Sequence, residues 1–242
     1  MNSSLYELFR NKFFDLQYAR LKKKWDNASA GSKLKGLVIM YHHVTDEHVD
    51  ILESCQCTVD SFRSTLVRLK SEGYVFVSLD SLMKFIEMKS DKKFAVVTFD
   101  DVPDNVYYNA YPILKEMNIP FALFMTVGFI DKDGYLSREQ LMELDKDSLC
   151  TIGAHTMTHP QLRRVKNSYE EMSESKMSLE NILNHPVDYL AYPFGTQSSV
   201  SVDVMKEAEK IGFKCAFGTI QTPINDLSSK ALFYLPRLVI KH

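Results

Sequence analysis

Two adjacent carboxylates, Asp100 and Asp101, stand at the end of an apolar stretch. Residues 94–99 before them form an apolar and β-branched run, which is typical of a strand buried on both faces. Successive side chains of a strand point to opposite faces, and carboxylates held close together separate their proton affinities. One acid can therefore bind a cation while its neighbour handles a proton. The alternative is that the pair caps a helix expected over 106–117, whose N-terminus favours negative charge.

A second chemical motif is His155-Thr-Met-Thr-His159, which directly follows the apolar run 149–154. If the segment is helical, both imidazoles project to one side, which is the spacing used for a shared metal ion. One carboxylate and two imidazoles make a three-ligand set that leaves a coordination position for water, as in catalytic zinc sites. Histidine pairs also arise by chance in cores and on surfaces, so this pair indicates a metal only together with the carboxylates.

Three motifs in this order resemble those of the polysaccharide deacetylases, the metal-dependent carbohydrate esterase family 4, which share a nodulation-type deacetylase homology domain. The motifs are Thr98-Phe99-Asp100-Asp101, His155-Thr156-x-x-His159 and Tyr192-Pro193-Phe194-Gly195, and the resemblance covers Leu37 to Ile240. It implies an α/β fold, a distorted (β/α)7–8 barrel of mostly parallel strands. It also implies Asp100 as general base, and Asp101, His155 and His159 as ligands of a divalent metal ion. Zn²⁺ is the first expectation, and Co²⁺, Ni²⁺ or Fe²⁺ suit the same ligands.

Near the N-terminus, Tyr41-His42-His43-Val44 resembles a motif from the branch of this family whose motif order is permuted. The resemblance implies His42 as the general acid, whereas His43 does not match the motif. The alternative is a pair of solvated loop histidines. The residues implied as walls of the substrate site are Tyr41, Tyr192, Pro193 and Phe194. Aromatic residues at strand ends also often belong simply to the core.

Two positions depart from the motifs of the family. Val102 follows the two aspartates where the family usually has glycine, so the loop after them is expected to differ in shape. Ala191 stands where the family has an arginine that pairs with the catalytic aspartate. Because a buried base carboxylate needs a positive partner, we predict that Arg237 replaces that arginine as the third catalytic residue.

The elements that must position these residues alternate along the chain. With 242 residues, 45% of them hydrophobic, the chain can form one large core, and strands alternating with helices predict a mostly parallel barrel. In such barrels the chemistry gathers at the C-terminal ends of the strands, where His42, Asp100, His155 and Phe194 are expected. Capping boxes at Ser137 and Ser168 each predict a helix start. Expected strands cover 36–41, 74–78, 94–101, 120–127, 149–154, 188–192, 214–218 and 233–240, and expected helices cover 60–71, 106–117, 137–144, 168–184 and 201–211.

Residues 1–35 differ from the barrel domain expected over 36–242. They hold eight basic and three acidic residues, and apolar residues recur at helical spacing from Leu5 to Leu21. This pattern predicts a basic amphipathic helix that contacts a membrane surface or a partner, or one that closes an end of the barrel. The net charge of −2 gives no reason to expect nucleic acid as a partner. No transmembrane or signal-peptide pattern occurs, which favours the cytoplasm, with peripheral membrane contact as an addition.

The four cysteines are too few and too unevenly spaced to predict a disulfide scaffold. Cys55 and Cys57, with His48 nearby, form at most a weak second metal motif, and an incidental or reactive loop pair is the alternative.

The resemblance implies a metal-dependent hydrolase that removes acetyl groups from N-acetylated amino sugars of a polysaccharide or its precursor. Two alternatives stay open. One is an O-acetyl esterase on the same scaffold, and the other is a catalytically degenerate protein that binds glycan. The sequence identifies neither the sugar nor the oligomeric state.

Overall fold

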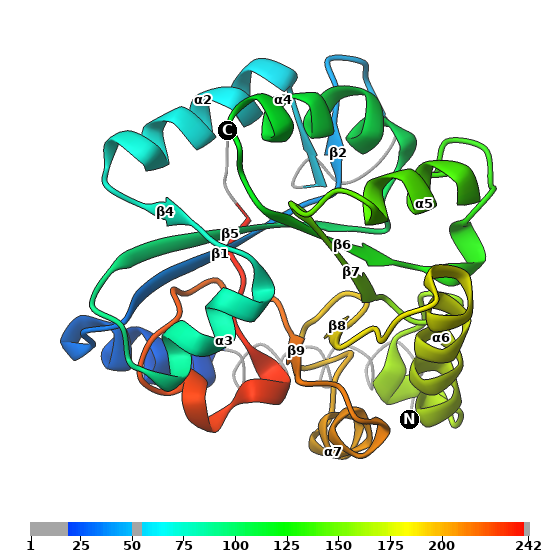
Figure 1. The fold of residues 1–242 in the computed structure, drawn as a ribbon. Helices are drawn as coiled ribbons and strands as arrows, with labels where there is room; N and C mark the ends of the chain where they lie inside the picture. Colours follow the sequence, from blue (N-terminus) through cyan, green and yellow to red (C-terminus); the bar gives the residue numbers. More distant parts are fainter. Residues whose placement is uncertain (1–18, 50–54, 240–242) are drawn as a thin grey trace.

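A curled sheet of parallel strands forms the centre of the fold, in a computed structural model that describes residues 19–49 and 55–239 (Figure 1). Its hydrogen-bonded path runs through β1 (Lys35–Tyr41), β5 (Lys93–Asp100), β6 (Phe121–Met125), β7 (Cys150–Ala154), β8 (Tyr189–Ala191) and β9 (Cys215–Phe217). The short strand β4 (Val75–Phe76) pairs with the first half of β5. This arrangement confirms the distorted α/β barrel that the sequence predicts.

Helices cover the outside of the sheet (Figure 1). The outer helices are α2 (Val59–Ser71), α4 (Tyr111–Glu116), α5 (Arg138–Asp145), α6 (Ser168–Leu183) and α7 (Val202–Ile211), with a π-helical turn over Val106–Ala110 before α4. In contrast, α3 (Leu79–Glu87) packs Leu82 and Ile86 into the core cluster on the inner face of the sheet. Short 3₁₀ turns span Val127–Phe129, Leu162–Arg164, Ser228–Lys230 and Leu232–Tyr234. Two small strands, β2 (His43–Val44) and β3 (Gln56–Cys57), form a separate parallel pair beyond the end of β1.

Alternate residues of β5 enter different parts of the core. Phe94 and Val96 join a cluster with residues of β1, β6, β8 and β9, which is the interior of the curl. Val97 and Phe99 join the larger cluster between the sheet and its outer helices. Because side chains alternate along a strand, Asp100 follows Phe94 and Val96 into the interior. The period of this buried strand therefore decides which of the two aspartates is enclosed.

The last segment of the chain closes the curl between β9 and β1. The Leu235 N–H donates to Ala216 and the Leu238 N–H donates to Val38, so residues 235–238 bridge both edges. The strand predicted over 233–240 is wrong as a regular strand, since a 3₁₀ turn ends at Tyr234 and only isolated bridges follow. Pro236 has no N–H to continue a ladder, which explains the interruption.

Residues 19–31 are helical and pack against the barrel. Trp25 is buried in the larger core cluster, and Asn225 donates to the Trp25 carbonyl over 3.1 Å and to Ser29 Oγ over 2.8 Å. The apolar residues from Leu5 to Leu16 lie outside the described part of the chain, so contact of this region with a membrane stays a prediction. Over residues 19–49 and 55–239, no helix has both the length and the apolar character that a membrane span requires.

Candidate active site at the strand ends

The sequence motifs converge at the C-terminal end of the barrel. Asp100 is the last residue of β5, His155 follows β7 and Phe194 follows β8. Beyond the strand, Asp101 adopts a left-handed backbone with φ of 59°, so the extended geometry of β5 does not continue to this residue. Asp100 is buried, whereas the side chain of Asp101 keeps about a fifth of its surface exposed. The strand alternation expected to separate the two carboxylates ends at Asp100, and one oxygen of each carboxylate lies 3.8 Å from His155 Nε2.

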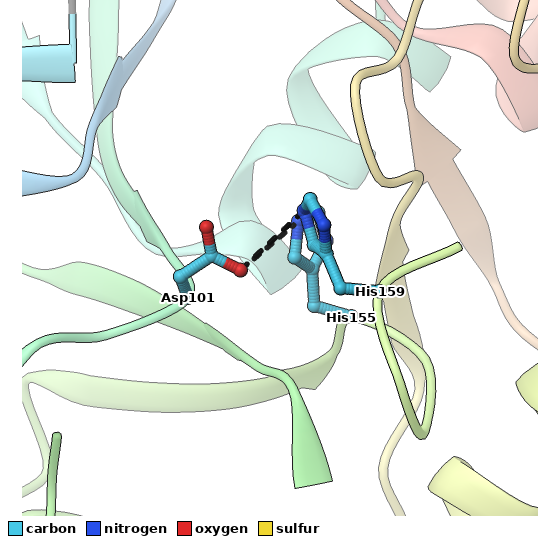
Figure 2. Close-up of side chains that lie close together, drawn as sticks. All are labelled: Asp101, His155 and His159. Atoms are coloured by element: carbon cyan, nitrogen blue, oxygen red, sulfur yellow. Dashed lines mark ion pairs between the residues drawn. The ribbon is translucent and has the colours of Figure 1, made fainter. Parts of the chain in front are cut away.

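Asp101, His155 and His159 form a cluster that fits a metal ion (Figure 2). Asp101 Oδ1 lies 3.8 Å from His155 Nε2 and 3.5 Å from His159 Nε2, and one donor atom from each residue lies within 4.8 Å of the others. The first two separations are close to those of ligands around a tetrahedral ion, whose bonds are about 2 Å long. Figure 2 shows both imidazoles turned toward the carboxylate.

Contacts behind the cluster fix the protonation of His155. Its Nδ1 lies 2.7 Å from the Ala191 carbonyl, which can only accept, so Nδ1 carries the proton and Nε2 presents a lone pair. Burial lowers the pKa of His155 below its ordinary value despite the nearby aspartates, so the imidazole is neutral, as a metal ligand must be. On the other side, Thr126 Oγ1 donates to Asp101 Oδ1 over 3.1 Å.

The segment that carries the two histidines is a loop, so the helical spacing considered for it is wrong. Thr156 and His159 have left-handed backbones, with φ of 70° and 59°. The His159 N–H donates to Thr156 Oγ1 over 3.1 Å, which closes the loop on itself. The imidazoles converge because of this turn, with ring centroids 5.0 Å apart.

Arg237 forms a bidentate ion pair with Asp100 inside the barrel. Its Nη1 and Nη2 donate to the two carboxylate oxygens over 2.6 and 2.7 Å, and Nε donates to the Gly218 carbonyl over 3.1 Å. Burial alone would raise the pKa of Asp100, but the charge and hydrogen bonds of Arg237, with the nearby His155, hold that pKa well below its usual value. Asp100 is therefore ionised although it is enclosed.

His42 follows β1 and faces the same end of the barrel. Its Nδ1 is buried and has no hydrogen-bond partner in the described part of the chain. Burial opposes protonation, but contact with Cys55 and the charges of Asp100 and Asp101 raise the pKa of His42 above 6.5. Its neighbour His43 is different, because Asn105 Nδ2 lies 2.9 Å from His43 Nδ1 and burial lowers the pKa of that imidazole.

Of the four residues predicted as substrate walls, only Phe194 is open to solvent. Its side chain is 49% exposed, and its ring centroid lies 4.8 Å from that of His159. Tyr41 and Tyr192 are buried at 5% and 0% exposure, so stacking of a sugar on either ring is ruled out for this conformation. Pro193 is buried as well. Tyr41 packs between Phe62 and Phe99, and the Tyr192 hydroxyl donates to the Phe233 carbonyl, which makes both part of the core.

The loop after the aspartates shows why glycine is usual at position 102. Val102 has φ of 52°, a left-handed conformation that a β-branched residue adopts at a cost. Its side chain is fully buried in the larger core cluster, and this burial offsets part of the strain. The loop therefore keeps a glycine-like backbone, and the departure from the motif leaves the aspartates in place.

Some residues around the site have no motif that predicts them. Thr126 donates a hydrogen bond to Asp101, and Asn105 Oδ1 accepts from the N–H of Val44, which follows His42 and His43. Glu171 accepts three hydrogen bonds from the loop between the two histidines. A position just after a strand is the one available signal for Thr126, whereas no sequence pattern places Asn105 or Glu171 at the site. The described residues hold no second group of three or more metal-type side chains, so the Cys55 and Cys57 motif gains no support.

Comparisons with known proteins agree with the motifs. A sequence model of the family named polysaccharide deacetylase matches residues 87–216, more than half of the chain. YxkH of Bacillus subtilis (strain 168), named as a polysaccharide deacetylase, is 27% identical over 208 residues, which cover 83% of this chain and 71% of YxkH. The poly-β-1,6-N-acetyl-D-glucosamine N-deacetylase of Staphylococcus aureus (strain MRSA252) is 28% identical over 196 residues, which cover 74% of this chain and 66% of that protein.

Solved structures show the same fold. BC0361, a polysaccharide deacetylase from Bacillus cereus, superposes with a TM-score of 0.74 at 27% identity, over 84% of this chain and 64% of that one. The Streptococcus pyogenes deacetylase PplD, solved in complex with acetate, also gives 0.74 at 26% identity, over 85% of this chain and 92% of that one. The ordered motifs, the curled parallel sheet and these matches together show that the chain belongs to the polysaccharide deacetylase family.

Proposed function

We propose that this chain is a metal-dependent hydrolase that removes acetyl groups from N-acetylated amino sugars of a polysaccharide or its precursor. The observation that carries the proposal is the juxtaposition of an Asp101, His155 and His159 cluster with an ionised, enclosed Asp100. A site that only bound glycan would gain nothing from a buried carboxylate beside an open set of metal ligands.

Asp101, His155 and His159 would hold the metal ion. Their donor set, one carboxylate oxygen and two imidazole nitrogens, is that of catalytic zinc sites, and the tautomer fixed at Ala191 points a lone pair of His155 into the cluster. When bound, a divalent cation would lower the pKa of the attacking water and polarise the acetyl carbonyl. The partial exposure of Asp101 and His159 leaves the substrate a path to this position.

Asp100 accepts the proton of the attacking water. Arg237 keeps the carboxylate ionised and fixes the orientation of both oxygens, so the base is ready without prior deprotonation. His155 Nε2 lies 3.8 Å from Asp100 Oδ2, which places the base beside the metal ligands. The oxygen of the water forms a bond to the acetyl carbon, and its proton passes to Asp100.

His42 donates a proton to the sugar nitrogen as the carbon–nitrogen bond breaks, so that acetate and a free amine leave. Its raised pKa, which burial opposes and Cys55 and the two aspartates promote, favours the protonated imidazole that this step requires. Phe194 offers an exposed aromatic face next to His159, against which the apolar face of a sugar ring can pack. The name of the Staphylococcus aureus relative supports N-acetylglucosamine as the sugar.

Removal of divalent metal is expected to abolish deacetylation. The protein is treated with a chelator, dialysed and assayed for acetate and free amine released from β-1,6-linked N-acetylglucosamine oligomers. Activity is expected to fall to background and to return with stoichiometric Zn²⁺, Co²⁺ or Ni²⁺, because the ligand set suits all three. Full activity in the metal-free protein would contradict the proposal. Release of acetate from O-acetylated oligomers alone would favour the esterase alternative.

His42→Ala is expected to slow cleavage of N-acetyl substrates by roughly 10²–10⁴-fold, the usual contribution of a positioned general acid. Activated acetyl esters should lose much less, because their leaving group needs little protonation. His43→Ala is the matched control, since His43 is bound to Asn105 and should not change the ratio of the two rates. Equal losses on both substrates in His42→Ala would contradict its assignment as the acid.

A further inference from the structure

The loop between the two histidines of the cluster is held from behind by one side chain of α6. Glu171 Oε2 accepts from the Met157 N–H over 3.0 Å and from the Thr158 N–H over 2.9 Å. Its Oε1 accepts from Thr158 Oγ1 over 2.7 Å. Both oxygens of the carboxylate are therefore used on two of the three residues between the histidines.

The burial of Glu171 makes this contact unusual for a helix side chain. The residue is 8% exposed, and none of the ion pairs among the described residues includes it. The first turn of α6 favours an acidic residue, but burial of a carboxylate with only neutral donors is costly, and the helix start alone does not account for that burial. Its position in Ser168-x-x-Glu171 predicts a capping box, but Ser168 Oγ donates to Glu207 and no side-chain cap forms at this helix start. The Glu171 carboxylate therefore accepts hydrogen bonds from the loop and does not cap its own helix.

The opposite side of the loop is held by backbone alone. The Val127 N–H donates to the Thr156 carbonyl over 3.1 Å, and the Gly128 N–H donates to the Met157 carbonyl over 2.8 Å. A Cβ at position 128 would lie 2.8 Å from that same carbonyl oxygen, so glycine is needed for this approach. The loop is thus fixed between a 3₁₀ turn and Glu171, and Glu171 is the side chain through which a substitution can release it.

We propose that Glu171 is a positioning residue for the metal site, which holds the 155–159 loop so that His155 and His159 present their donor atoms before the ion binds. This inference rests on the proposed function, because it assumes that the cluster binds a metal. The two ligands flank the three loop residues, and the left-handed Thr156 and His159 make the loop unfavourable when unsupported. Loss of supporting contacts of this kind typically weakens metal affinity about 10–100-fold.

Three variants test whether the hydrogen bonds to the loop are required for metal affinity, or whether any polar side chain at this position is sufficient. Glu171→Met keeps the volume and removes both carboxylate oxygens and the three hydrogen bonds that they accept, whereas the backbone carbonyl at 171 still accepts from the Met157 N–H over 3.2 Å. Glu171→Gln can keep all three hydrogen bonds, because its carbonyl accepts from both N–H groups and its amide can donate to Thr158 Oγ1. Thr158→Val removes only the hydroxyl contact. Glu170→Met is the matched control, since Glu170 is exposed on the same turn of α6.

The measurement is the dissociation constant for Zn²⁺ of the metal-free full chain, by competition with a chromophoric chelator, together with denaturant unfolding of the same metal-free samples. We expect Glu171→Met to bind Zn²⁺ about 10–100-fold more weakly and Thr158→Val to show a smaller loss. Glu171→Gln should stay within a few-fold of the wild type, and Glu170→Met should match it. Saturating Zn²⁺ should return deacetylation in Glu171→Met toward the wild-type rate.

Two results would overturn the inference in distinguishable ways. If the wild type binds Zn²⁺ and both Glu171→Met and Thr158→Val bind it equally well, then Glu171 only stabilises the fold, and the proposed function stands. If the wild type itself binds no divalent metal, the proposed function fails, and the positioning of metal ligands fails with it. Should Glu171→Met not fold, Thr158→Val and Glu171→Gln still decide, because an affinity of Thr158→Val equal to that of the wild type would overturn the inference.

Discussion

Asp100→Asn is expected to abolish turnover while Zn²⁺ stays bound, whereas Asp101→Asn is expected to lose the metal. Asp100 turns into the barrel to Arg237, and Asp101 turns to the two histidines, so each substitution removes a different function. Loss of a general base typically costs about 10²–10⁴-fold in rate. The measurements are acetate release at saturating Zn²⁺ and the dissociation constant for Zn²⁺ in the same preparations.

The two aspartate variants control for each other because the residues are adjacent and the substitution is the same. Asp100→Asn also leaves Arg237 buried without a countercharge, so its unfolding free energy should fall, by about 3–5 kcal/mol on the scale of broken buried pairs. Activity is therefore compared at a temperature where all variants are folded. Full activity in both variants would contradict the assignment of the site, and equal loss of metal in both would contradict the division of roles.

The sequence is sufficient to predict which residues meet at the site. Parallel strands bring their C-terminal ends to one edge, so acids after one apolar run and histidines after another converge whatever the details of the helices between them. The pairing of Arg237 with Asp100, across 137 positions, follows from the family resemblance, in which an arginine pairs with the aspartate, together with Ala191 in the place of that arginine. A buried carboxylate must have a partner, and few cations lie near a strand end.

The sequence is not sufficient to predict how the histidine loop is held. The spacing of His155 and His159 is compatible with a helix, and the actual loop depends on left-handed residues and on Glu171, which lies outside the motif. Ser168 and Glu171 match a local capping pattern, but the local pattern contains no information about the N–H groups at 157 and 158 that compete for the carboxylate. The Glu171 carboxylate accepts from these N–H groups of the loop and does not cap the start of α6.

The predicted substrate walls fail for a related reason. Tyr41 and Tyr192 both lie at strand ends, but whether a strand-end ring faces solvent depends on the curl of the sheet and on what packs over it. Phe62 of α2 covers Tyr41, and the segment at Phe233 covers Tyr192. Residue type alone cannot distinguish such rings from Phe194, whose left-handed backbone, with φ of 61°, accompanies an exposed ring.

Arg237→Met is expected to cost about 3–5 kcal/mol of unfolding free energy and to shift the pH dependence of the enzyme. Burial favours the protonated form of Asp100, and Arg237 is the main charge that opposes it, so its removal raises the pKa of that carboxyl. The acid limb of the pH–rate profile should then move to higher pH, since the base must lose a proton before it can act. The measurements are denaturant unfolding and the pH–rate profile at saturating Zn²⁺.

The sign of the stability change with pH follows from the same ion pair. The folded pKa of Asp100 is below its ordinary value of 3.8, so the pair stabilises the wild type above pH 3.8, and this contribution is lost as pH falls below that value. In Arg237→Met the pKa of Asp100 in the folded state is raised, so protonation of Asp100 at low pH no longer destabilises the folded protein. The stability difference between wild type and variant should therefore begin to narrow as pH falls through the raised pKa of the variant, and should narrow further below pH 3.8. A difference that stays constant with pH would contradict the assigned pair.

Two further experiments test whether burial is the reason that this ion pair affects the unfolding free energy and the pKa of Asp100. Arg63 makes the same bidentate contact with Glu116, over 3.0 and 2.7 Å, but on the surface. Arg63→Met should therefore change neither the unfolding free energy nor the pH–rate profile appreciably.

In a double-mutant cycle, Arg237→Met added to Asp100→Leu should lower the unfolding free energy far less than Arg237→Met does in the wild type, because no buried charge is then left unpaired. Additive losses would mean that Arg237 stabilises the barrel through its contacts with Gly218 and Phe124 alone, and that something other than Arg237 keeps Asp100 ionised.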